Sequence, residues 1–476
     1  MSEQLHNFVG GSIDDTPSTQ RSDLVDPSTG SVVGTAPITD AAGIDRAVTA
    51  ARAAFPEWKS STPAQRSNAL LQLAALIEKH GSDFVEAEVA NTGKPIQLTL
   101  EEEVGPMVDQ LRFFAGATRC MNAPAATEYM QGHTSYVRRE ALGVIAQIAP
   151  WNYPMMMAVW KFAPALAAGN TVVLKPAETT PASVLLLAEL ASQVLPPGVF
   201  NVVCGGRETG QHLVSHSGVD MAAITGSVRA GIDVAKRAAD SLKRVHLELG
   251  GNAPVVVLDD ANIETAAAQI AVAGLFNAGQ DCTAATRVIA TPGVYDSLVE
   301  ALGAEAAKTI TAGPDNTDAL YGPLNNASQL ERVSGLVDRI ESHATIVTGG
   351  SRLGSPGYFY SPTVIAGVQQ HDEIVQQEIF GPVITIQEAK DDEAAIKAAN
   401  DVPYGLASSV WTNDHQTAMR ASAELDFGCV WINTHIPLVA EMPHGGFKYS
   451  GYGKDLSMFS IEDYSRVKHV MSNLGT

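Results

Sequence analysis

Apolar positions near the start of the chain recur at helical spacing. Between residues 40 and 118, apolar side chains return every three or four positions, which is the period of one face of an α-helix. The pattern predicts helices over residues 45–55, 63–80 and 84–91. We therefore expect this segment to form a helical layer rather than part of a sheet.

After residue 140, short apolar runs alternate with segments of helical period. The runs predict strands at 144–148, 171–174, 199–203, 221–224 and 245–247. Two of the intervening segments predict helices over 154–168 and 181–194. Apolar strands joined by helices are typical of βαβ units, so we expect a parallel, doubly wound sheet in an α/β protein.

A second alternating series begins after Gly250–Gly251. It predicts a helix over 262–277 and strands at 253–258, at 287–290, around 384, at 408–411 and at 430–433. A chain of 476 residues exceeds the size at which one core keeps growing, so a second α/β domain is expected here. The alternating stretch 127–139 predicts a hairpin that interrupts the first domain and pairs with another subunit.

Composition narrows the possible partners. The net charge is −21, which repels phosphate backbones and makes nucleic acid an unsuitable partner. The same charge is compatible with a cationic substrate. The first ten residues lack the pattern of a signal peptide. The apolar stretch 155–169 is too short to span a membrane and contains Lys161. We expect a cytoplasmic enzyme.

The cysteines are widely spaced and form no CxxC pair. Cys120, Cys204, Cys282 and Cys429 therefore suggest neither a zinc site nor a disulfide framework. Free thiols fit a reducing compartment.

Cys282 and Glu248 form the most informative pair of residues. Cys282 follows a helix-like run and has small and polar neighbours, whereas Glu248 ends an apolar strand and precedes two glycines. Such a pair can supply a nucleophile and a base that activates water. On its own, Cys282 is equally compatible with a buried structural thiol.

Three turns at strand ends suggest a nucleotide site. They are 174–178, with a lysine and a glutamate, 225–227, which opens a helix, and 205–210, which only approximates a glycine-rich loop. Each alone is more often a plain turn, but three in one sheet favour nucleotide binding. Asn152, between two prolines, can donate to an oxyanion, although a turn asparagine is the simpler interpretation.

Six segments together resemble the NAD(P)-dependent aldehyde dehydrogenase superfamily. In chain order they are PWNYP (150–154), KPAE (175–178), TGS (225–227), LELGG (247–251), GQDC (279–282) and EIFGP (378–382). Any one is a modest signal, whereas all six in order are specific. The resemblance covers nearly the whole chain.

This resemblance implies three structural parts. A Rossmann-type cofactor domain is expected at 1–119 and 140–249, and an α/β catalytic domain at 250–448. A small β element for oligomerisation is expected at 120–139 and 449–476, usually in a dimer or tetramer. The cofactor is expected to be NAD, held by Ile148, Pro150, Trp151, Lys175, Ala177, Glu178, Gly210, Thr225, Gly226, Ser227, Leu249, Gly250, Glu378 and Phe380.

The resemblance also implies the catalytic roles. Cys282 attacks the aldehyde, Asn152 stabilises the oxyanion, and Glu248 activates the water that hydrolyses a thioester. No metal is expected. Many family members carry a glutamate where this chain has Asp455, as the partner of the lysine matched by Lys161 in a proton relay. The shorter acid is expected to act through water.

Within the family, the chain is most similar to bacterial 4-aminobutyraldehyde dehydrogenases. Segments such as EMPHGG (441–446) and SGYGKD (450–455) carry this resemblance. Betaine aldehyde dehydrogenases share much of the pattern, so betaine aldehyde or a broad range of aldehydes are alternative substrates. The expected substrate is an aminoaldehyde, bound near Tyr153, Met156, Trp160, Glu103, Asp109, Asp281 and Thr283.

The sequence argues against two rival functions. A CoA-acylating enzyme on the same fold does not need a water-activating glutamate, so Glu248 argues against it. A non-catalytic protein on this fold is expected to lose the nucleophile or the base, and the chain has both.

Overall fold

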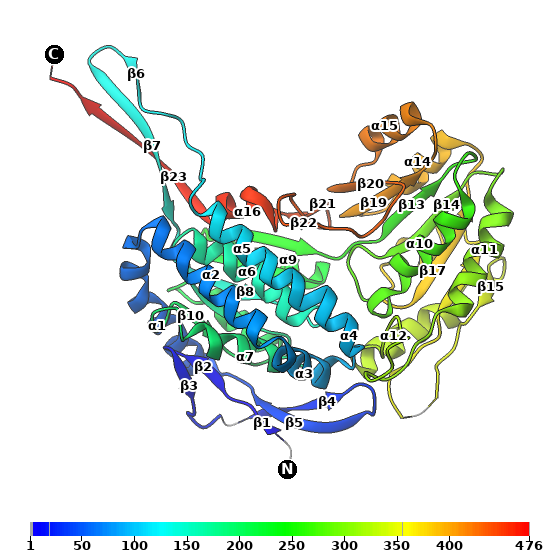
Figure 1. The fold of residues 1–476 in the computed structure, drawn as a ribbon, viewed down its shortest axis with the longest axis horizontal. Coiled ribbons are helices and arrows are strands. Elements are labelled where there is room, and N and C mark those ends of the chain that lie inside the picture. The colour runs from blue at the N-terminus through cyan, green and yellow to red at the C-terminus, as the bar shows by residue number, and fades with distance from the viewer. Residues whose placement is uncertain (1–2, 19, 355, 476) are drawn as a thin grey trace.

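The computed structural model describes residues 3–18, 20–354 and 356–475. Two large sheets, each covered by helices, form the two halves of the molecule, and a narrow three-stranded sheet projects from one end (Figure 1). The predicted α/β fold class is confirmed.

The first sheet has eight strands in the order β22-β12-β11-β8-β9-β10-β2-β3. Its five strands from β12 to β10 are parallel, as the alternating pattern predicts. The edges differ from that prediction, because β22 and the β2–β3 hairpin pair antiparallel. The strands are β2 (Asn7–Val9), β3 (Ser12–Asp14), β8 (Val144–Ile148), β9 (Thr171–Lys175), β10 (Phe200–Val202), β11 (Met221–Gly226), β12 (Arg244–Leu249) and β22 (Gly451–Tyr452).

Helices cover the first sheet. The helical segments predicted before residue 119 are confirmed, with longer boundaries for α1 and α3 and an end one residue earlier for α2. Helix α6 lies between the sheet and α2 and α5, and its residues are buried and apolar except for Lys161 and the half-buried Met156. The helices are α1 (Ala41–Ser60), α2 (Pro63–Lys79), α3 (Gly81–Thr92), α4 (Ile96–Thr99), a π-helix (Leu100–Val104), α5 (Gly105–Ala117), α6 (Pro154–Ala167), α7 (Ala182–Ala191), α8 (Arg207–Ser215) and α9 (Val228–Ala239).

The second sheet has seven strands in the order β15-β16-β17-β14-β13-β19-β20, and all except β15 are parallel. The strands predicted between 253 and 433 lie in this sheet. They are β13 (Ala253–Val257), β14 (Ala285–Ala290), β15 (Thr345–Thr348), β16 (Thr363–Ala366), β17 (Val383–Glu388), β19 (Ala407–Trp411) and β20 (Cys429–Ile432). The helices are α10 (Ile263–Leu275), α11 (Tyr295–Lys308), α12 (Ala327–Asp338), α13 (Glu373–Gln376), α14 (Asp392–Asn400) and α15 (His415–Glu424).

The projecting sheet contains the predicted hairpin. Strands β6 (Thr127–Met130) and β7 (His133–Ala141) form it, and β23 (Ser465–Asn473) from the end of the chain pairs with β7 along its whole length. The sheet extends away from the body (Figure 1). The remaining elements are β1 (Glu3–Gln4), β4 (Arg21–Asp26), β5 (Ser31–Pro37), β18 (Tyr404–Gly405), β21 (Phe447–Lys448) and α16 (Ser457–Asp463).

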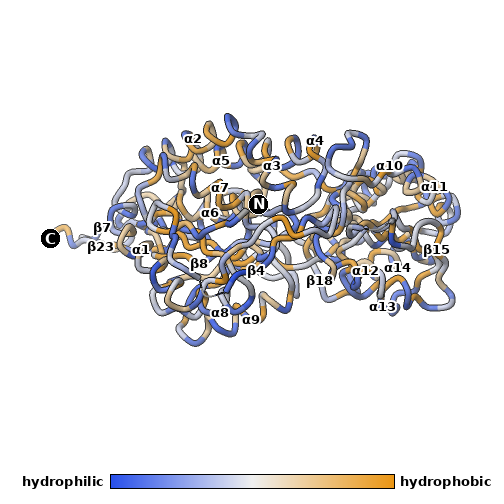
Figure 2. Tube along the Cα trace, turned by 90° about the horizontal axis from the view of Figure 1, so that it is seen from below, coloured by the Kyte–Doolittle hydropathy of each residue, from blue (hydrophilic) through white to orange (hydrophobic). Residues whose placement is uncertain are grey.

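Hydropathy follows this architecture. In Figure 2 the hydrophobic segments run along the packed strands and helices, and hydrophilic segments are frequent on the outer turns. Within the described ranges, no helix combines the length and the apolar character needed to cross a bilayer.

Candidate active site

A strained turn presents Cys282. After α10 the chain enters a short 3₁₀ turn (Phe276–Gly279), where Asn277 and Ala278 have left-handed φ angles of 52° and 58°. Such conformations cost about 1–3 kcal/mol per non-glycine residue and persist where the surroundings enforce them. Asn277 Nδ2 secures the turn by donating to the carbonyl oxygens of Asn152 at 3.0 Å and Gln280 at 3.1 Å.

Two glycines allow the close approaches that the turn needs. A Cβ atom on Gly279, whose φ is 63°, would lie 2.0 Å from the carbonyl oxygen of Gly381. A Cβ on Gly251 would lie 2.1 Å from the carbonyl oxygen of Cys282. The segment that leaves β12 therefore passes directly against the cysteine backbone, as the predicted role of glycine at a close contact requires.

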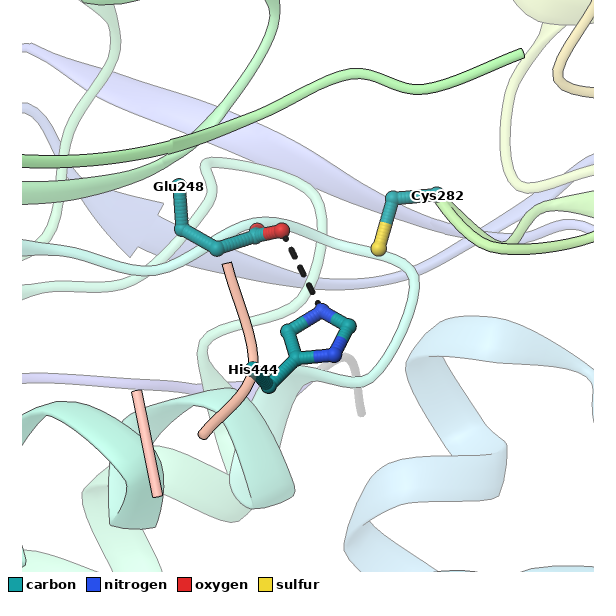
Figure 3. Close-up of side chains that lie close together, drawn as sticks. All are labelled: Glu248, Cys282 and His444. Atoms are coloured by element: carbon teal, nitrogen blue, oxygen red, sulfur yellow. Dashed lines mark ion pairs between the residues drawn. The ribbon is translucent and has the colours of Figure 1, made fainter. Parts of the chain in front are cut away.

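This approach brings Glu248 to Cys282, together with His444. Glu248 lies on β12 and is 2% exposed, whereas Cys282 is half-buried. One carboxylate oxygen, the cysteine Sγ and one imidazole nitrogen lie within 4.8 Å of one another (Figure 3). The predicted pair is thus adjacent in space. Glu248 lies on β12 of the first sheet, whereas Cys282 lies just before β14 of the second sheet.

His444 is the third side chain of this group. Its backbone exchanges two hydrogen bonds with Asp455, of 2.9 and 2.7 Å, and its ring packs edge-on against Trp160 with centroids 5.1 Å apart. Its Nε2 lies 3.4 Å from Glu248 Oε1. Among the described residues, neither ring nitrogen of His444 nor Glu248 Oε1 makes a hydrogen bond.

The surroundings of Cys282 disfavour its charged form. Desolvation raises the pKa of the thiol well above its usual value, and the carboxylates of Glu248, Asp281 and Glu378 raise it further. The thiol is therefore neutral at rest. Attack on a substrate requires that the thiol first lose this proton.

Asn152 lies where an oxyanion donor is needed. It lines the same cavity as Cys282 and Glu248. Its Nδ2 donates to the carbonyl oxygen of Gln280 at 3.1 Å. An amide group carries two donor hydrogens, so this bond orients the side chain and leaves one N–H for another acceptor.

Two adjoining cavities extend from Cys282 across the end of the first sheet. Their volumes are about 780 and 560 Å³, and Pro150, Trp151, Thr225, Gly226 and Ser227 line both. Every residue predicted to hold the cofactor lines one or both of them. The larger also includes Ile148, Lys175, Ala177, Glu178 and Gly210, and the smaller includes Leu249, Gly250, Glu378 and Phe380.

The larger cavity has features suited to a phosphate-bearing ligand. Ser227 caps α9 by accepting from Ala230 N at 3.3 Å, so the helix N-terminus faces this cavity. Thr225 Oγ1 is buried, and no described residue gives it a hydrogen-bond partner. Lys175 Nζ donates to the carbonyl oxygens of Pro176 and Gly205, and burial lowers its pKa to about 8. Glu178 is exposed at the rim.

The smaller cavity joins this region to the thiol. Glu378 Oε1 accepts from the backbone N–H of Gly251 at 2.9 Å, and burial raises the pKa of Glu378 to about 7. Phe380, with a φ of 56°, packs edge-on against Trp151. Gln329 Nε2 donates to the Phe380 carbonyl oxygen at 2.7 Å.

The sequence analysis missed several residues of these cavities. They include Arg207, Arg229, Asp233 and Arg237 in the larger cavity and Gln329, Arg332 and Tyr404 in the smaller. Gln329 and Arg332 come from α12, a helix that was not predicted. No motif marked them.

Part of the predicted substrate set surrounds Asp281. Tyr153 OH donates to Asp281 Oδ2 at 2.8 Å, and Thr283 donates to Asp281 Oδ1 through both its N–H and its hydroxyl at 2.7 Å. Met156 is half-buried and Trp160 is 3% exposed on α6.

The predicted distal carboxylates lie elsewhere or are already paired. Glu103 is 2% exposed and binds Lys94, whose Nζ also lies 4.4 Å from the centre of the Tyr153 ring. Asp109 is exposed on α5 and lines neither cavity. A protein cation therefore occupies the Tyr153 face that was expected to attract an ammonium group.

Lys161 lies behind the site rather than in either cavity. It is fully buried, and its Nζ donates to Asp455 Oδ2 at 2.6 Å. The shorter acid thus reaches the lysine directly, without the water that the sequence analysis expected. His246 Nε2 lies 3.0 Å from the other oxygen of Asp455, and His246 Nδ1 lies 3.2 Å from Asp463.

Comparison with known proteins gives a consistent result. Residues 14–470 match the aldehyde dehydrogenase family. Aldehyde dehydrogenase family 2 member B4 of Arabidopsis thaliana is 40% identical, over 98% of this chain and 88% of that protein. Lactaldehyde dehydrogenase from Escherichia coli is 34% identical, with a TM-score of 0.97 over 99% of this chain and 100% of that chain.

A third relative carries a ligand. The structure of betaine aldehyde dehydrogenase from Staphylococcus aureus in complex with NAD⁺ is 32% identical and has a TM-score of 0.96, over 99% of this chain and 95% of that chain. The chain belongs to the aldehyde dehydrogenase family.

Proposed function

We propose that the protein oxidises an aldehyde to a carboxylic acid with NAD as the cofactor. The observation that carries this proposal is the meeting of Cys282 and Glu248 within 4.8 Å in the smaller of the two adjoining cavities, which together are lined by all the predicted cofactor residues. A thiol beside a carboxylate provides both covalent attack and water activation.

The reaction proceeds in two stages. The Cys282 thiol loses its proton to solvent, and Sγ forms a bond to the aldehyde carbon while the oxyanion accepts a hydrogen bond from the free N–H of Asn152. A single donor of this kind contributes about 3 kcal/mol. Bound NAD supplies the hydride acceptor. Loss of hydride from the adduct leaves a thioester on Cys282, and Glu248 then removes a proton from the water that hydrolyses it.

NAD is preferred over NADP in this proposal. The cavity offers a helix N-terminus to the phosphates and the exposed carboxylate of Glu178 at its rim. A carboxylate accepts from a ribose 2′-hydroxyl and repels a 2′-phosphate. We expect a higher kcat/KM with NAD than with NADP, and Glu178→Gln should reduce the ratio. A ratio of one or less in the wild type would contradict this role for Glu178.

For the substrate we propose an aminoaldehyde such as 4-aminobutanal. The carboxylates of Glu248, Asp281 and Glu378 all act on Cys282, so the field at the thiol favours a cation and opposes an anion. Trp160 provides an aromatic side chain on α6, and a ring face attracts an ammonium group by about 0.5–2 kcal/mol. Because Lys94 and its partner Glu103 largely offset each other, neither is assigned a role in binding.

A substrate panel tests this proposal. NADH production is followed by absorbance with 4-aminobutanal, betaine aldehyde, butanal and succinic semialdehyde, each with and without added CoA. We expect 4-aminobutanal to exceed butanal in kcat/KM, and succinic semialdehyde to be the poorest. Trp160→Leu should narrow the gap and Trp160→Phe, which keeps a ring, should preserve most of it. Equal use of butanal, or better use of succinic semialdehyde, would leave only the general aldehyde oxidation standing.

We also propose that the projecting sheet joins subunits into a dimer or tetramer. Its exposed side chains include Tyr129, Met130, Val467 and Met471, and apolar surface of this kind on an edge strand is a site for pairing. Light scattering on the purified protein tests this, and a monomer would contradict it. All four cysteines are free, which agrees with a reducing compartment such as the cytoplasm.

A further inference from the structure

We propose that Cys282, Glu248 and His444 form a binding site for a divalent transition-metal ion of the zinc type, and that the bound ion reversibly blocks the thiol. The blocking depends on the proposed role of Cys282 in aldehyde oxidation. The binding itself depends only on the three side chains, so the two can be tested separately.

The three ligand atoms are close to the spacing that such an ion requires. Zinc bonds of about 2.0–2.3 Å in a tetrahedral arrangement separate neighbouring ligand atoms by about 3.5 Å. His444 Nε2 and Glu248 Oε1 are 3.4 Å apart, and all three ligand atoms lie within 4.8 Å of one another. Figure 3 shows the three side chains directed toward a common point.

The ligand atoms are also free of other bonds. Within the described part of the chain, both ring nitrogens of His444 and Glu248 Oε1 are buried without a hydrogen-bond partner. Buried polar atoms are nearly always paired in native proteins. His444 is 1% exposed and Glu248 is 2% exposed, so a bound ion would give both groups a bond that their 3.4 Å contact with each other does not supply.

Charge and ligand type favour a zinc-like ion. In addition to desolvation, the carboxylates of Glu248 and Asp281 disfavour the charged form of the Cys282 thiol and raise its pKa, and the same negative charge attracts a cation. On binding, the S–H bond breaks, the proton leaves to solvent and a metal–sulfur bond forms, with no change in oxidation state. A sulfur, a nitrogen and an oxygen ligand suit zinc or cobalt and not magnesium or calcium. Water from the adjoining cavity completes the fourth position.

Cobalt(II) provides a direct test that needs no enzyme activity. A thiolate bound to cobalt gives a charge-transfer absorption band, and tetrahedral cobalt absorbs in the visible range. We expect both in the wild-type protein, loss of the charge-transfer band in Cys282→Ser, and affinity weakened at least about tenfold in His444→Gln. His212→Gln changes an exposed histidine on α8 and serves as the matched control, with unchanged binding. Melting curves establish that each variant is folded, and His444→Phe replaces His444→Gln if that variant is unstable.

Two outcomes of the cobalt titration would contradict the proposed metal site. Binding of equal strength in the wild type and in the folded His444 variant would show a simple thiolate adduct and overturn the site. Absence of a cobalt band in the wild type would do the same.

Zinc inhibition tests the second part of the proposal. Each variant is measured relative to its own rate without metal, and we expect inhibition that EDTA reverses and that the His444 variant weakens about tenfold or more. Cobalt binding without zinc inhibition would contradict the blocking. If no aldehyde is oxidised under any condition, the proposed function fails, while the cobalt titration still decides the metal site.

Discussion

Two buried polar clusters lie next to each other and are built in opposite ways. In the reactive cluster, ligating atoms of Cys282, Glu248 and His444 lie within 4.8 Å of one another, and His444 Nε2 is 3.4 Å from Glu248 Oε1. In the ion-pair cluster, Asp455 contacts both Lys161, at 2.6 Å, and His246, at 3.0 Å. The backbones of His444 and Asp455 hydrogen-bond to each other, so a single β-bridge joins the two clusters.

The electrostatic effects are opposite as well. In the reactive cluster, desolvation and neighbouring carboxylates raise the pKa of Cys282. In the ion-pair cluster, burial alone would raise the pKa of Asp455, but Lys161 and His246 hold it well below its usual value. The first cluster therefore disfavours the thiolate of Cys282, whereas the second stabilises the carboxylate of Asp455. We infer that the first serves reactivity and the second serves stability.

The largest expected effect is that of Cys282→Ala. Removing the nucleophile should lower kcat by about 10⁴-fold or more, while NAD binding and the melting temperature stay close to those of the wild type. Assays of NADH formation measure kcat, calorimetry measures NAD binding, and thermal melting gives the melting temperature. Substantial remaining turnover would exclude Cys282 as the nucleophile.

Glu248→Gln should separate the two stages of the reaction. Hydrolysis loses its base, so steady-state turnover should fall by about 10³-fold, and stability should not decrease because the change removes a buried carboxylate with an unpaired oxygen. The thioester forms without Glu248 in the proposed mechanism, so a rapid burst of NADH should remain. Stopped-flow absorbance measures the burst. A variant with neither burst nor turnover would indicate that Glu248 chiefly activates the thiol.

Asp455→Asn should lower the stability of the protein, in contrast to Glu248→Gln. It leaves Lys161 as a buried charge without its anion, which typically costs about 3 kcal/mol or more of unfolding free energy. Chemical denaturation measures this cost. Asp463→Asn removes the partly exposed carboxylate beside His246 and is the matched control with a smaller loss. If Asp455→Asn left stability unchanged but slowed the reaction strongly, the predicted relay role of Lys161 would gain support and our division between the clusters would fail.

The smallest effect should be the pH dependence of His246→Gln. Burial and Lys161 lower the pKa of His246, but Asp455 and Asp463 outweigh them and raise it overall. A raised pKa in the folded state means that the histidine stabilises the protein fully below its unfolded pKa of about 6.5, and that this contribution disappears as pH rises through the higher folded value. The stability difference between wild type and variant should therefore be larger at pH 6 than at pH 9. A difference that grows with pH would contradict this sign.

Local sequence pattern accounts for much of the fold. The central strands of both sheets are apolar runs bounded by turns, and they are where the pattern predicted them. The edges were not predicted, because β22 has two residues and its antiparallel pairing with β12 depends on the chain returning from the far end. Helices α11, α12, α14 and α15 were also missed.

The residues of the candidate site also divide into those that a local motif predicts and those that depend on tertiary packing. Cys282 and Glu248 stand in motifs, and the cofactor residues lie at strand ends whose positions a parallel sheet dictates. His444 is remote from both in sequence and reaches them through its bridge to Asp455. The pairing of Lys94 with Glu103 likewise depends on tertiary packing. No local spacing encodes contacts of this kind.

The central claim is that Cys282 carries the acyl group and Glu248 releases it. Glu248→Gln is mixed with aldehyde and NAD, quenched in acid within the first turnover, digested and examined by mass spectrometry. Our account predicts an acyl group, attached as a thioester, on the peptide that contains Cys282, and none when NAD is omitted. An unmodified Cys282 alongside NADH formed in an amount matching the enzyme, or an acyl group on another residue, would contradict it.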